Sequence, residues 1–216
     1  MAGVLAAIDR ALGARVVKPA LFVACAAPAA GIAWEAWAGL LGVNPTEELL
    51  HQTGKTALFI LFTSLTITPL RRLLHLNRLQ RVRRMLGVWA FAYAVAHFSI
   101  YILYDQGCIY WSACDAAFTW ADITRRKFIF VGMLAFTILL ALTVTSTNGW
   151  VRRLGRRWQA LHRLVYVAAM AGVIHFTWKQ KADISEPLRW ACVLAALLGI
   201  RVYLAVRKRQ SGRADS

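Results

Sequence analysis

The sequence is poor in acidic residues and in cysteine. It has 10 Asp and Glu against 26 Lys and Arg, a formal net charge of +16 over 216 residues. Such a charge on a small chain is typical of nucleic-acid-binding proteins. However, 59% of the residues are hydrophobic and the mean hydropathy is +0.50, whereas a soluble nucleic-acid binder needs a polar surface. The combination predicts an integral membrane protein with its charge in the loops and no nucleic-acid partner.

The sequence also lacks the motifs that mark several kinds of site in soluble proteins. The four cysteines form no Cys-x-x-Cys and no Cys-x-x-Cys-His motif, which excludes a zinc ribbon and covalent haem attachment. No phosphate-binding glycine loop, paired carboxylate or Ser/His/Asp constellation is present, so no catalytic residue is assigned. Six spanning helices of about 20 residues leave no room for a soluble nucleotide-binding domain. We expect one domain at 19–206, between cytoplasmic tails at 1–18 and 207–216.

Six apolar stretches approach the length of a membrane-spanning helix. They are residues 19–41, 56–70, 85–104, 128–146, 161–178 and 188–206. They predict an all-α integral membrane protein, a six-helix bundle embedded in lipid. The N-terminus lacks the short apolar core and small-residue cleavage site of a signal peptide, so we expect the first helix to be a retained anchor.

Charge alternates between the loops. The loops rich in basic residues are the N-terminus, 71–84, 148–158 and the C-terminus. They hold 17 basic and two acidic residues. The remaining loops, 42–55, 105–127 and 179–189, hold seven basic and seven acidic residues. By the positive-inside rule, both termini are predicted to be cytoplasmic.

Histidines supply the candidate chemistry, because ionisable residues inside a membrane are costly and mark functional sites. His97 lies in the third predicted span, and His162 and His175 lie at the two ends of the fifth. His51 and His75 fall in predicted loops and are interpreted as surface residues.

His97 and His175 are predicted to share one depth, roughly 20 Å from the cytoplasmic start of their helices. Two neutral imidazoles at matched depth on different helices can be the axial ligands of one b-type haem, which favours electron transfer. The alternative interpretations are hydrogen-bonded core histidines or a proton relay.

The inner histidine, His162, has no histidine partner at its own depth. Arg83, fourteen residues before His97, is either a haem or propionate partner or one of a row of topology-setting arginines. His162 and His175 are thirteen residues apart and face different sides of an ideal helix. A π-bulge near Gly172 or two separately placed haems would reconcile them, so one or two haems remain open.

Other polar features have two interpretations each. Glu35 is a candidate for quinone or proton chemistry, or an interfacial carboxylate facing water. Cys108 and Cys114 are a disulfide or two separate thiols. The aromatic loop 105–127 is a candidate docking surface, or it rests on lipid. Arg201 is expected to snorkel to the cytoplasmic face.

Four blocks of sequence carry a further signal. They are Arg-Arg-Met-Leu-Gly at 83–87 leading to His97 and Tyr101, Leu-Ala-Leu-Thr-Val-Thr-Ser at 140–146, Arg-Leu-Gly-Arg-Arg-Trp-Gln-Ala-Leu-His-Arg-Leu-Val-Tyr at 153–166 with His175, and Thr-Pro-Leu-Arg at 68–71. Over about 54–203 the chain resembles the ferric-reductase-like transmembrane family. Within that family it is most similar to the MsrQ family, the haem-binding subunits of periplasmic methionine sulfoxide reductase systems.

The resemblance implies a multi-pass protein of the bacterial inner membrane with haem ligands at His97, His162 and His175. It implies electron transfer from the quinone pool or a soluble flavin reductase to a periplasmic molybdopterin-containing catalytic subunit. That partner, and not this chain, would reduce methionine sulfoxide in oxidised envelope proteins. The resemblance also implies FMN as a further cofactor. Relatives with two haems use four histidines, and here Arg83 stands at the fourth position.

Two other functions fit the same residues. A stand-alone ferric or cupric reductase would use the same haem and differ only in its acceptor. A histidine-relay proton channel or transporter is disfavoured, because the spans contain no Asp or Glu apart from Glu35 near the outer end of the first, and show no broken-helix repeat.

Overall fold

The computed structural model describes residues 2–12, 15–110, 114–180 and 183–214, and every regular element in these ranges is helical. The first half contains α1 (Ala2–Leu12), α2 (Val17–Trp37), α3 (Pro45–Leu74), η1 (Asn77–Leu79), α4 (Gln80–Ile100) and the π-helical η2 (Tyr101–Asp105). The second half contains α5 (Ala116–Arg125), α6 (Lys127–Val144), α7 (Asn148–Leu154), α8 (Arg156–His162), α9 (Val165–Lys179) and α10 (Ser185–Ala214). Six segments are long and apolar enough to cross a membrane. The predicted all-α, six-helix membrane fold is confirmed.

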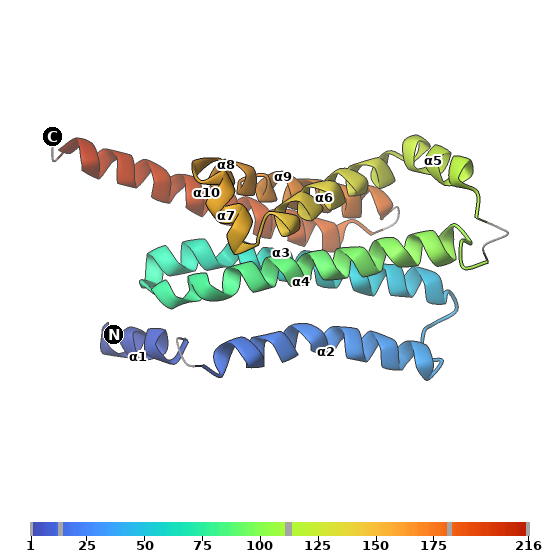
Figure 1. Cartoon of the computed structure of the whole chain (residues 1–216), viewed down its shortest axis with the longest axis horizontal. Helices are drawn as coiled ribbons and strands as arrows, with labels where there is room; N and C mark the ends of the chain where they lie inside the picture. The colour runs from blue at the N-terminus through green and yellow to red at the C-terminus, as the bar shows by residue number, and fades with distance from the viewer. Residues whose placement is uncertain (1, 13–14, 111–113, 181–182, 215–216) are drawn as a thin grey trace.

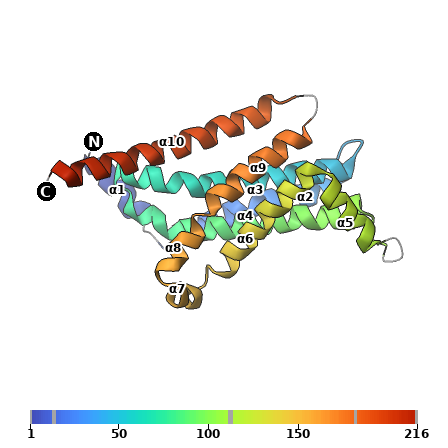
Figure 2. The same cartoon turned by 90° about the horizontal axis from the view of Figure 1, so that it is seen from above.

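The long helices run side by side along one axis, with α3 and α4 in the middle (Figure 1). α2 lies on one side of this pair, and α6, α9 and α10 lie on the other. Seen from above, α10 lies along one edge of the bundle and α7 lies at the opposite edge (Figure 2). Both chain termini lie at the same end. We call this the termini end and the opposite one the far end.

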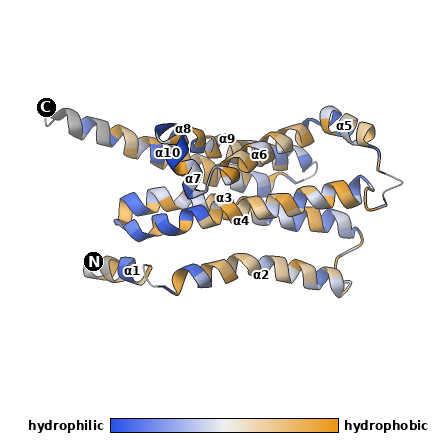
Figure 3. Ribbon diagram, viewed as in Figure 1, coloured by the Kyte–Doolittle hydropathy of each residue, from blue (hydrophilic) through white to orange (hydrophobic). Residues whose placement is uncertain are grey.

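The bundle is held together around α3. Leu61, Phe62 and Leu65 on this helix are almost completely buried, and on neighbouring helices Ala90 and Ala169 are fully buried. Small residues at such contacts let the backbones of spanning helices approach closely. Hydrophilic residues gather near the ends of the helices, most densely over α7, α8 and the start of α4 (Figure 3). This distribution matches helices whose middles face lipid or one another.

α3 begins eleven residues before the predicted start of the second span. Asn44 caps it by accepting a hydrogen bond from the Glu47 backbone N–H at 3.3 Å, and Pro45 occupies the first turn. The first three turns are polar, so their hydropathy resembles that of a loop. His51 therefore lies on a helix that lines two cavities, and its interpretation as a loop surface residue was wrong.

The fifth span is interrupted between His162 and Val165. Across the break, the Leu164 N–H donates to the Leu161 carbonyl at 3.0 Å and the Tyr166 N–H to the Arg163 carbonyl at 3.1 Å. These are tightened i→i−3 bonds, so the two histidines do not share one ideal helix. The helix irregularity thus lies at 163–164 and not near Gly172, where α9 is regular.

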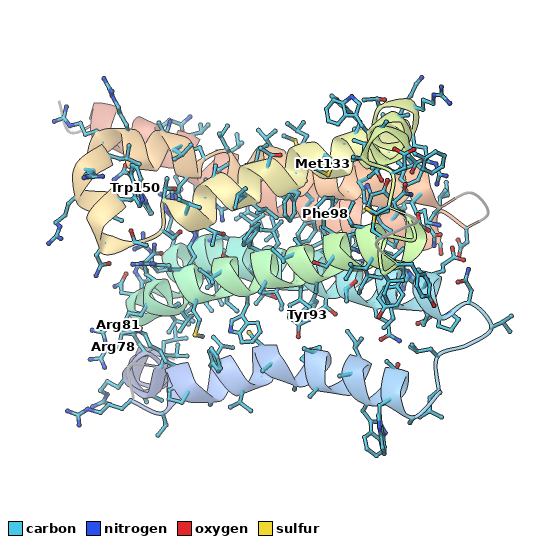
Figure 4. All side chains as sticks on the ribbon, turned by 45° about the vertical axis from the view of Figure 1, so that its right-hand side comes forward. Arg78, Arg81, Tyr93, Phe98, Met133 and Trp150 are labelled. Carbon is cyan, nitrogen blue, oxygen red and sulfur yellow. A yellow bond between two sulfur atoms is a disulfide. The ribbon has the colours of Figure 1, made fainter. Side chains whose placement is uncertain are left out.

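Tyr93 joins α2 to the centre of the bundle, and Figure 4 shows it pointing from α4 towards α2. Its hydroxyl donates to the Cys25 carbonyl at 2.7 Å and accepts from the Ala29 backbone N–H at 2.9 Å. Pro28 lies between these two residues, where it removes one backbone donor and strains the helical ladder. The Tyr93 hydroxyl therefore satisfies backbone groups beside the proline.

Cys108 and Cys114 form a disulfide in the far-end loop between η2 and α5. This decides between the two interpretations of these cysteines. Cys25 and Cys192 are free thiols. The loop is also joined to η2 by backbone bonds, from the Cys108 N–H to the Ile102 carbonyl and from the Ile109 N–H to the Leu103 carbonyl.

Candidate cofactor site

The structure brings His97 of α4 and His175 of α9 together in the far-end half of the bundle. Their ring centres lie 6.0 Å apart, and the ring planes are nearly perpendicular at 87°. The two residues are 78 positions apart in the chain and reach the same place from different helices, at the matched depth that the sequence predicts.

Each imidazole is oriented by one backbone carbonyl. Nδ1 of His97 lies 2.9 Å from the Leu50 carbonyl oxygen, and Nδ1 of His175 lies 2.6 Å from the Phe128 carbonyl oxygen. A carbonyl oxygen only accepts hydrogen bonds, so Nδ1 is the protonated nitrogen in both rings. Nε2 then carries the lone pair. This is the usual arrangement of a metal-binding histidine, whose second nitrogen donates to a carbonyl or carboxylate.

A glycine lies under each ring. A β-carbon on Gly54 would stand 3.1 Å from Nδ1 of His97, and one on Gly132 would stand 2.6 Å from Nδ1 of His175. Both glycines follow the accepting carbonyl by four residues, so they lie one helical turn further along the same face. At Gly132 only a residue without a side chain lets the His175 ring rest against the neighbouring helix. At Gly54 a β-carbon would require the His97 ring to shift by a few tenths of an ångström.

The two histidines line a cavity of about 620 Å³. Its inner part is apolar, and its lining there includes Leu58, Leu61, Leu139 and Ala168. Phe98 and Met133 also line it and lie close to one another on facing helices, whereas Arg78, Arg81 and Trp150 lie at the termini end (Figure 4). Charged residues also line the cavity towards the far end. They are Glu47, Glu48, Lys55, Asp105, Arg126 and Lys179.

This donor set fits a haem better than a bare metal ion. Metal–nitrogen bonds of about 2 Å on opposite sides of one metal put two imidazole centres about 6 Å apart, which matches the 6.0 Å between His97 and His175. The described residues contain no group of three or more His, Cys, Asp or Glu that would hold a metal ion. Two imidazoles alone leave four positions to a macrocycle, for which the apolar cavity provides a volume typical of ligand sites.

His162 and Arg83 do not reach this cavity. The His162 ring stacks on Trp158 with centres 3.9 Å apart, and its Nε2 lies 3.3 Å from the Thr145 hydroxyl. The Arg83 guanidinium donates to the Thr68 hydroxyl at 3.2 Å. Both residues lie nearer the termini end, Arg83 in the first turns of α4 and His162 at the end of α8.

Counted back by the same number of residues, the position in the first half that matches His162 is Arg84, the neighbour of the Arg83 that the resemblance places at the fourth position. His162 precedes His175 by thirteen residues, and Arg84 precedes His97 by the same number. The Arg84 guanidinium donates a hydrogen bond to the Asn148 side-chain oxygen at 2.8 Å. The second pair of positions therefore consists of an imidazole and a guanidinium, each with its own partners.

The expectation that Arg201 snorkels to the cytoplasmic face was wrong, because its side chain turns into the bundle. Its guanidinium donates to the Tyr166 hydroxyl and the Leu65 carbonyl and lies over the Tyr166 ring, 4.9 Å from the centroid. These partners draw it inwards, because a cation inside a membrane protein is stabilised by carbonyls and aromatic faces.

Sequence reasoning missed the carbonyls and glycines that hold the two rings. One signal was available: Gly54 precedes His97 by the same distance, 43 positions, as Gly132 precedes His175. Leu50 and Phe128 likewise precede His97 and His175 by equal distances, 47 positions.

Comparisons with known proteins agree with the geometry. The family model for the ferric reductase like transmembrane component matches residues 53–173. The protein-methionine-sulfoxide reductase heme-binding subunit MsrQ of Rhodospirillum rubrum is 46% identical over 203 residues, 94% of this chain and 95% of the relative. The subunits of the same name from Herminiimonas arsenicoxydans and Caulobacter vibrioides are 42% and 43% identical. They cover 92% and 85% of this chain, and the matches span 89% and 85% of the relatives.

No solved structure shows a significant match to the chain. The family match covers more than half of the chain, and the curated relatives match over most of their own length. The chain belongs to the ferric-reductase-like transmembrane family and, within it, to the MsrQ family of multi-pass inner-membrane proteins.

Proposed function

We propose that this chain binds b-type haem between His97 and His175 and serves as the electron-transfer subunit of a methionine sulfoxide reductase system. The observation that carries this proposal is the imidazole pair itself, 6.0 Å apart, with both Nδ1 atoms donating to carbonyls. The names of the relatives, which are heme-binding subunits, support it.

The protein's own residues would set the behaviour of the site. When bound, the haem supplies an iron that carries one electron by changing between its ferric and ferrous states. His97 and His175 would close both axial positions, which favours electron transfer over oxygen binding. The Leu50 and Phe128 carbonyls fix the direction of the rings and raise their basicity. The apolar part of the lining would keep water away from the haem iron.

Charge asymmetry supports an orientation with both termini in the cytoplasm, because the 17 basic residues fall in the loops at the termini end. The pair of His97 and His175 then lies towards the periplasm. The partner in this proposal is the periplasmic molybdopterin-containing catalytic subunit. Its candidate docking surface is the far-end segment at 105–127, on which Tyr110, Phe118 and Trp120 are exposed.

The remaining assignments complete the proposal. The haem domain comprises residues 19–206, and the donor is the quinone pool or a soluble flavin reductase. His162, with Arg83 nearby, is the candidate second haem site, and FMN is a candidate cofactor from the resemblance alone. A proton relay is disfavoured, since each Nδ1 of the central pair is already bonded to a carbonyl.

The test is an optical spectrum of the purified protein together with its haem content. We expect the narrow α-band and Soret band of a reduced b-type haem, and a protein that stays colourless when haem is supplied would refute the proposal. Reoxidation by the molybdoenzyme, but not by ferric or cupric chelates, separates the proposed subunit from a stand-alone metal reductase.

A further inference from the structure

The histidine cavity is apolar in its inner part and charged in its far-end part. Leu58, Leu61 and Leu139 line the inner part, and the far-end lining includes both basic and acidic side chains. A b-type haem has the same asymmetry, because its two propionate groups project from one edge of an otherwise apolar macrocycle. Burying an unpaired carboxylate among apolar side chains is costly. A haem in this cavity would therefore place its propionate edge towards the far end.

Three basic residues line the far-end part, and each has an acidic partner. Nζ of Lys55 lies 2.7 Å from the Glu186 carboxylate, and Nζ of Lys179 lies 3.0 Å from that of Glu47. Both pairs join two long helices, α3 to α10 and α9 to α3. The third basic residue, Arg126, lies directly before α6 and pairs within its own short segment. Its pairing therefore does not connect two spanning helices.

The Arg126 guanidinium is anchored on one side and open on the other. Its Nε lies 2.7 Å from Oδ1 of Asp122, four positions earlier in the chain. The Asp122 side chain is only 10% exposed, whereas that of Arg126 is 52% exposed. The ion pair uses Nε and leaves the donors of the two terminal nitrogens for another partner. Because Arg126 lines the cavity, its planar fork can bind a carboxylate there through two hydrogen bonds.

Asp122 is itself held in place from the other half of the site. Its Oδ2 accepts hydrogen bonds from the Tyr101 hydroxyl at 3.0 Å and from the Gln106 side-chain amide at 3.2 Å. Tyr101 lies about one helical turn after His97 and lines the same cavity. It begins the π-helical segment η2, and π-helical turns are frequent at functional sites. The carboxylate that anchors Arg126 is thus positioned from the His97 side of the site.

Arg126 is also close to the other histidine along the chain. It precedes Phe128, whose carbonyl oxygen lies 2.6 Å from Nδ1 of His175, by two residues. Its own carbonyl accepts the first hydrogen bonds of α6. Gly132, under the His175 ring, lies six residues further on, about 9 Å along the helix axis. Arg126 therefore lies beyond this ring on the far-end side.

We propose that Arg126 binds the propionate groups of the haem and that its ion pair with Asp122 positions it for this contact. The charged edge of the haem then faces the far end, on the side of the candidate docking surface at 105–127. This inference rests on the proposed function and deepens it, because it gives the haem a direction in the cavity. It also gives a role to the contacts of Tyr101 and Asp122, which connect the supports of the two histidines.

A positive charge beside the propionates affects two measurable properties of the haem. The guanidinium and the carboxylates form charge-assisted hydrogen bonds, which slow the release of the haem. The same charge stabilises the reduced haem relative to the oxidised haem, because reduction adds one negative charge. Loss of the guanidinium should therefore accelerate release and shift the reduction potential to more negative values.

The experiment uses the full chain in phosphatidylcholine nanodiscs, loaded either with haem b or with its dimethyl ester, in which both propionates are uncharged. Transfer to excess apomyoglobin gives the rate of release, and spectroelectrochemistry gives the reduction potential. With haem b, Arg126→Gln should release haem at least about tenfold faster than the parent chain, as the loss of charge-assisted hydrogen bonds implies. Its potential should be more negative. With the dimethyl ester, Arg126→Gln and the parent chain should release at equal rates.

Arg125→Gln is the matched control, because Arg125 has the same charge, lies at the adjacent position and is exposed outside the cavity lining. It should behave like the parent chain. Arg126→Lys keeps the charge but loses the fork, so it should retain the potential and recover only part of the slow release. Asp122→Asn removes the anchor and a negative charge. It should accelerate release but shift the potential to more positive values, opposite to Arg126→Gln.

Release of haem b from Arg126→Gln at the parent rate would overturn the inference, as would an equal acceleration with haem b and with the dimethyl ester. A larger acceleration in Lys55→Gln or Lys179→Gln than in Arg126→Gln would assign the propionates to a lysine and overturn it too. In each of these outcomes the parent chain still shows a six-coordinate haem spectrum, and the proposed function stands. A parent chain that binds no haem refutes the proposed function itself.

Discussion

Gly132 leaves no room for a side chain under His175, because a β-carbon on this glycine would stand 2.6 Å from Nδ1 and 2.9 Å from Cε1 of the ring. The ring cannot retreat without losing its 2.6 Å bond to the Phe128 carbonyl. The position of the His175 ring is thus set by the smallest residue on the neighbouring helix.

The first prediction concerns this glycine. Gly132→Ala should displace the His175 ring and remove most of the bound haem, measured as Soret absorbance per protein. Gly54→Ala should cause a smaller loss, because its β-carbon would lie 3.1 Å from the His97 ring. Gly87→Ala on α4 meets no atom within 4 Å and should keep all its haem. Full haem content in Gly132→Ala would show that the ring does not rest there when haem is bound.

The second prediction separates the three histidines. His97→Ala and His175→Ala should each abolish the spectrum of a six-coordinate b-type haem, since each removes one of the two proposed axial ligands. His162→Ala should preserve that spectrum, because its side chain contacts Trp158 and Thr145 away from the cavity. Electron paramagnetic resonance of the ferric protein, with haem counted per chain, checks this. A bis-histidine signal that survives either of the first two substitutions contradicts the assignment.

The third prediction concerns Tyr93. Tyr93→Phe leaves the Cys25 carbonyl and the Ala29 N–H without their hydroxyl partner, which should cost about 1–3 kcal/mol of stability. Thermal unfolding in detergent measures the loss. In a Pro28→Ala background the helix can close its own backbone bonds, so the same substitution should cost less. Equal losses in both backgrounds would mean that the hydroxyl does not serve the proline break.

The fourth prediction uses the disulfide to test the orientation. A disulfide between Cys108 and Cys114 persists only in an oxidising compartment, so the far end should face the periplasm. In cells expressing a chain without Cys25 and Cys192, a membrane-impermeant maleimide should label the protein only after reduction. If labelling requires permeabilised membranes, the far end faces the cytoplasm and the proposed topology is wrong. Replacing both cysteines with Ser should cost about 2 kcal/mol, the loop-closure entropy of a short loop.

The sequence was sufficient to predict the number of spans and the meeting of His97 with His175, because hydropathy marks helices in lipid and helical rise converts residue counts into depth. It was insufficient for the polar start of α3, since residues such as Gln52 resemble a loop unless the cavity that they face is known. The arithmetic for His162 assumed an unbroken helix, and the break at Arg163 and Leu164 invalidates it.

The supports of the rings were beyond sequence reasoning for a different reason. Leu50 and Phe128 act through their carbonyls, which every residue possesses, so side-chain chemistry gives no sign of them. Gly54 and Gly132 act through an absence of atoms. Only the repeated spacing of 43 positions to the histidine sets these glycines apart from the other glycines in the spans.

The carbonyls that orient the two imidazoles also accept a second hydrogen bond. In a regular α-helix, the Leu50 and Phe128 carbonyls also accept the backbone N–H four residues later, those of Gly54 and Gly132. Each of these carbonyl oxygens therefore accepts two hydrogen bonds, one from the Nδ1–H of a histidine and one from the backbone of its own helix. Bending α3 or α6 would lengthen one of these bonds and change how strongly the ring donates electrons to a metal. The orientation of each imidazole and the backbone geometry of α3 or α6 therefore depend on the same carbonyl.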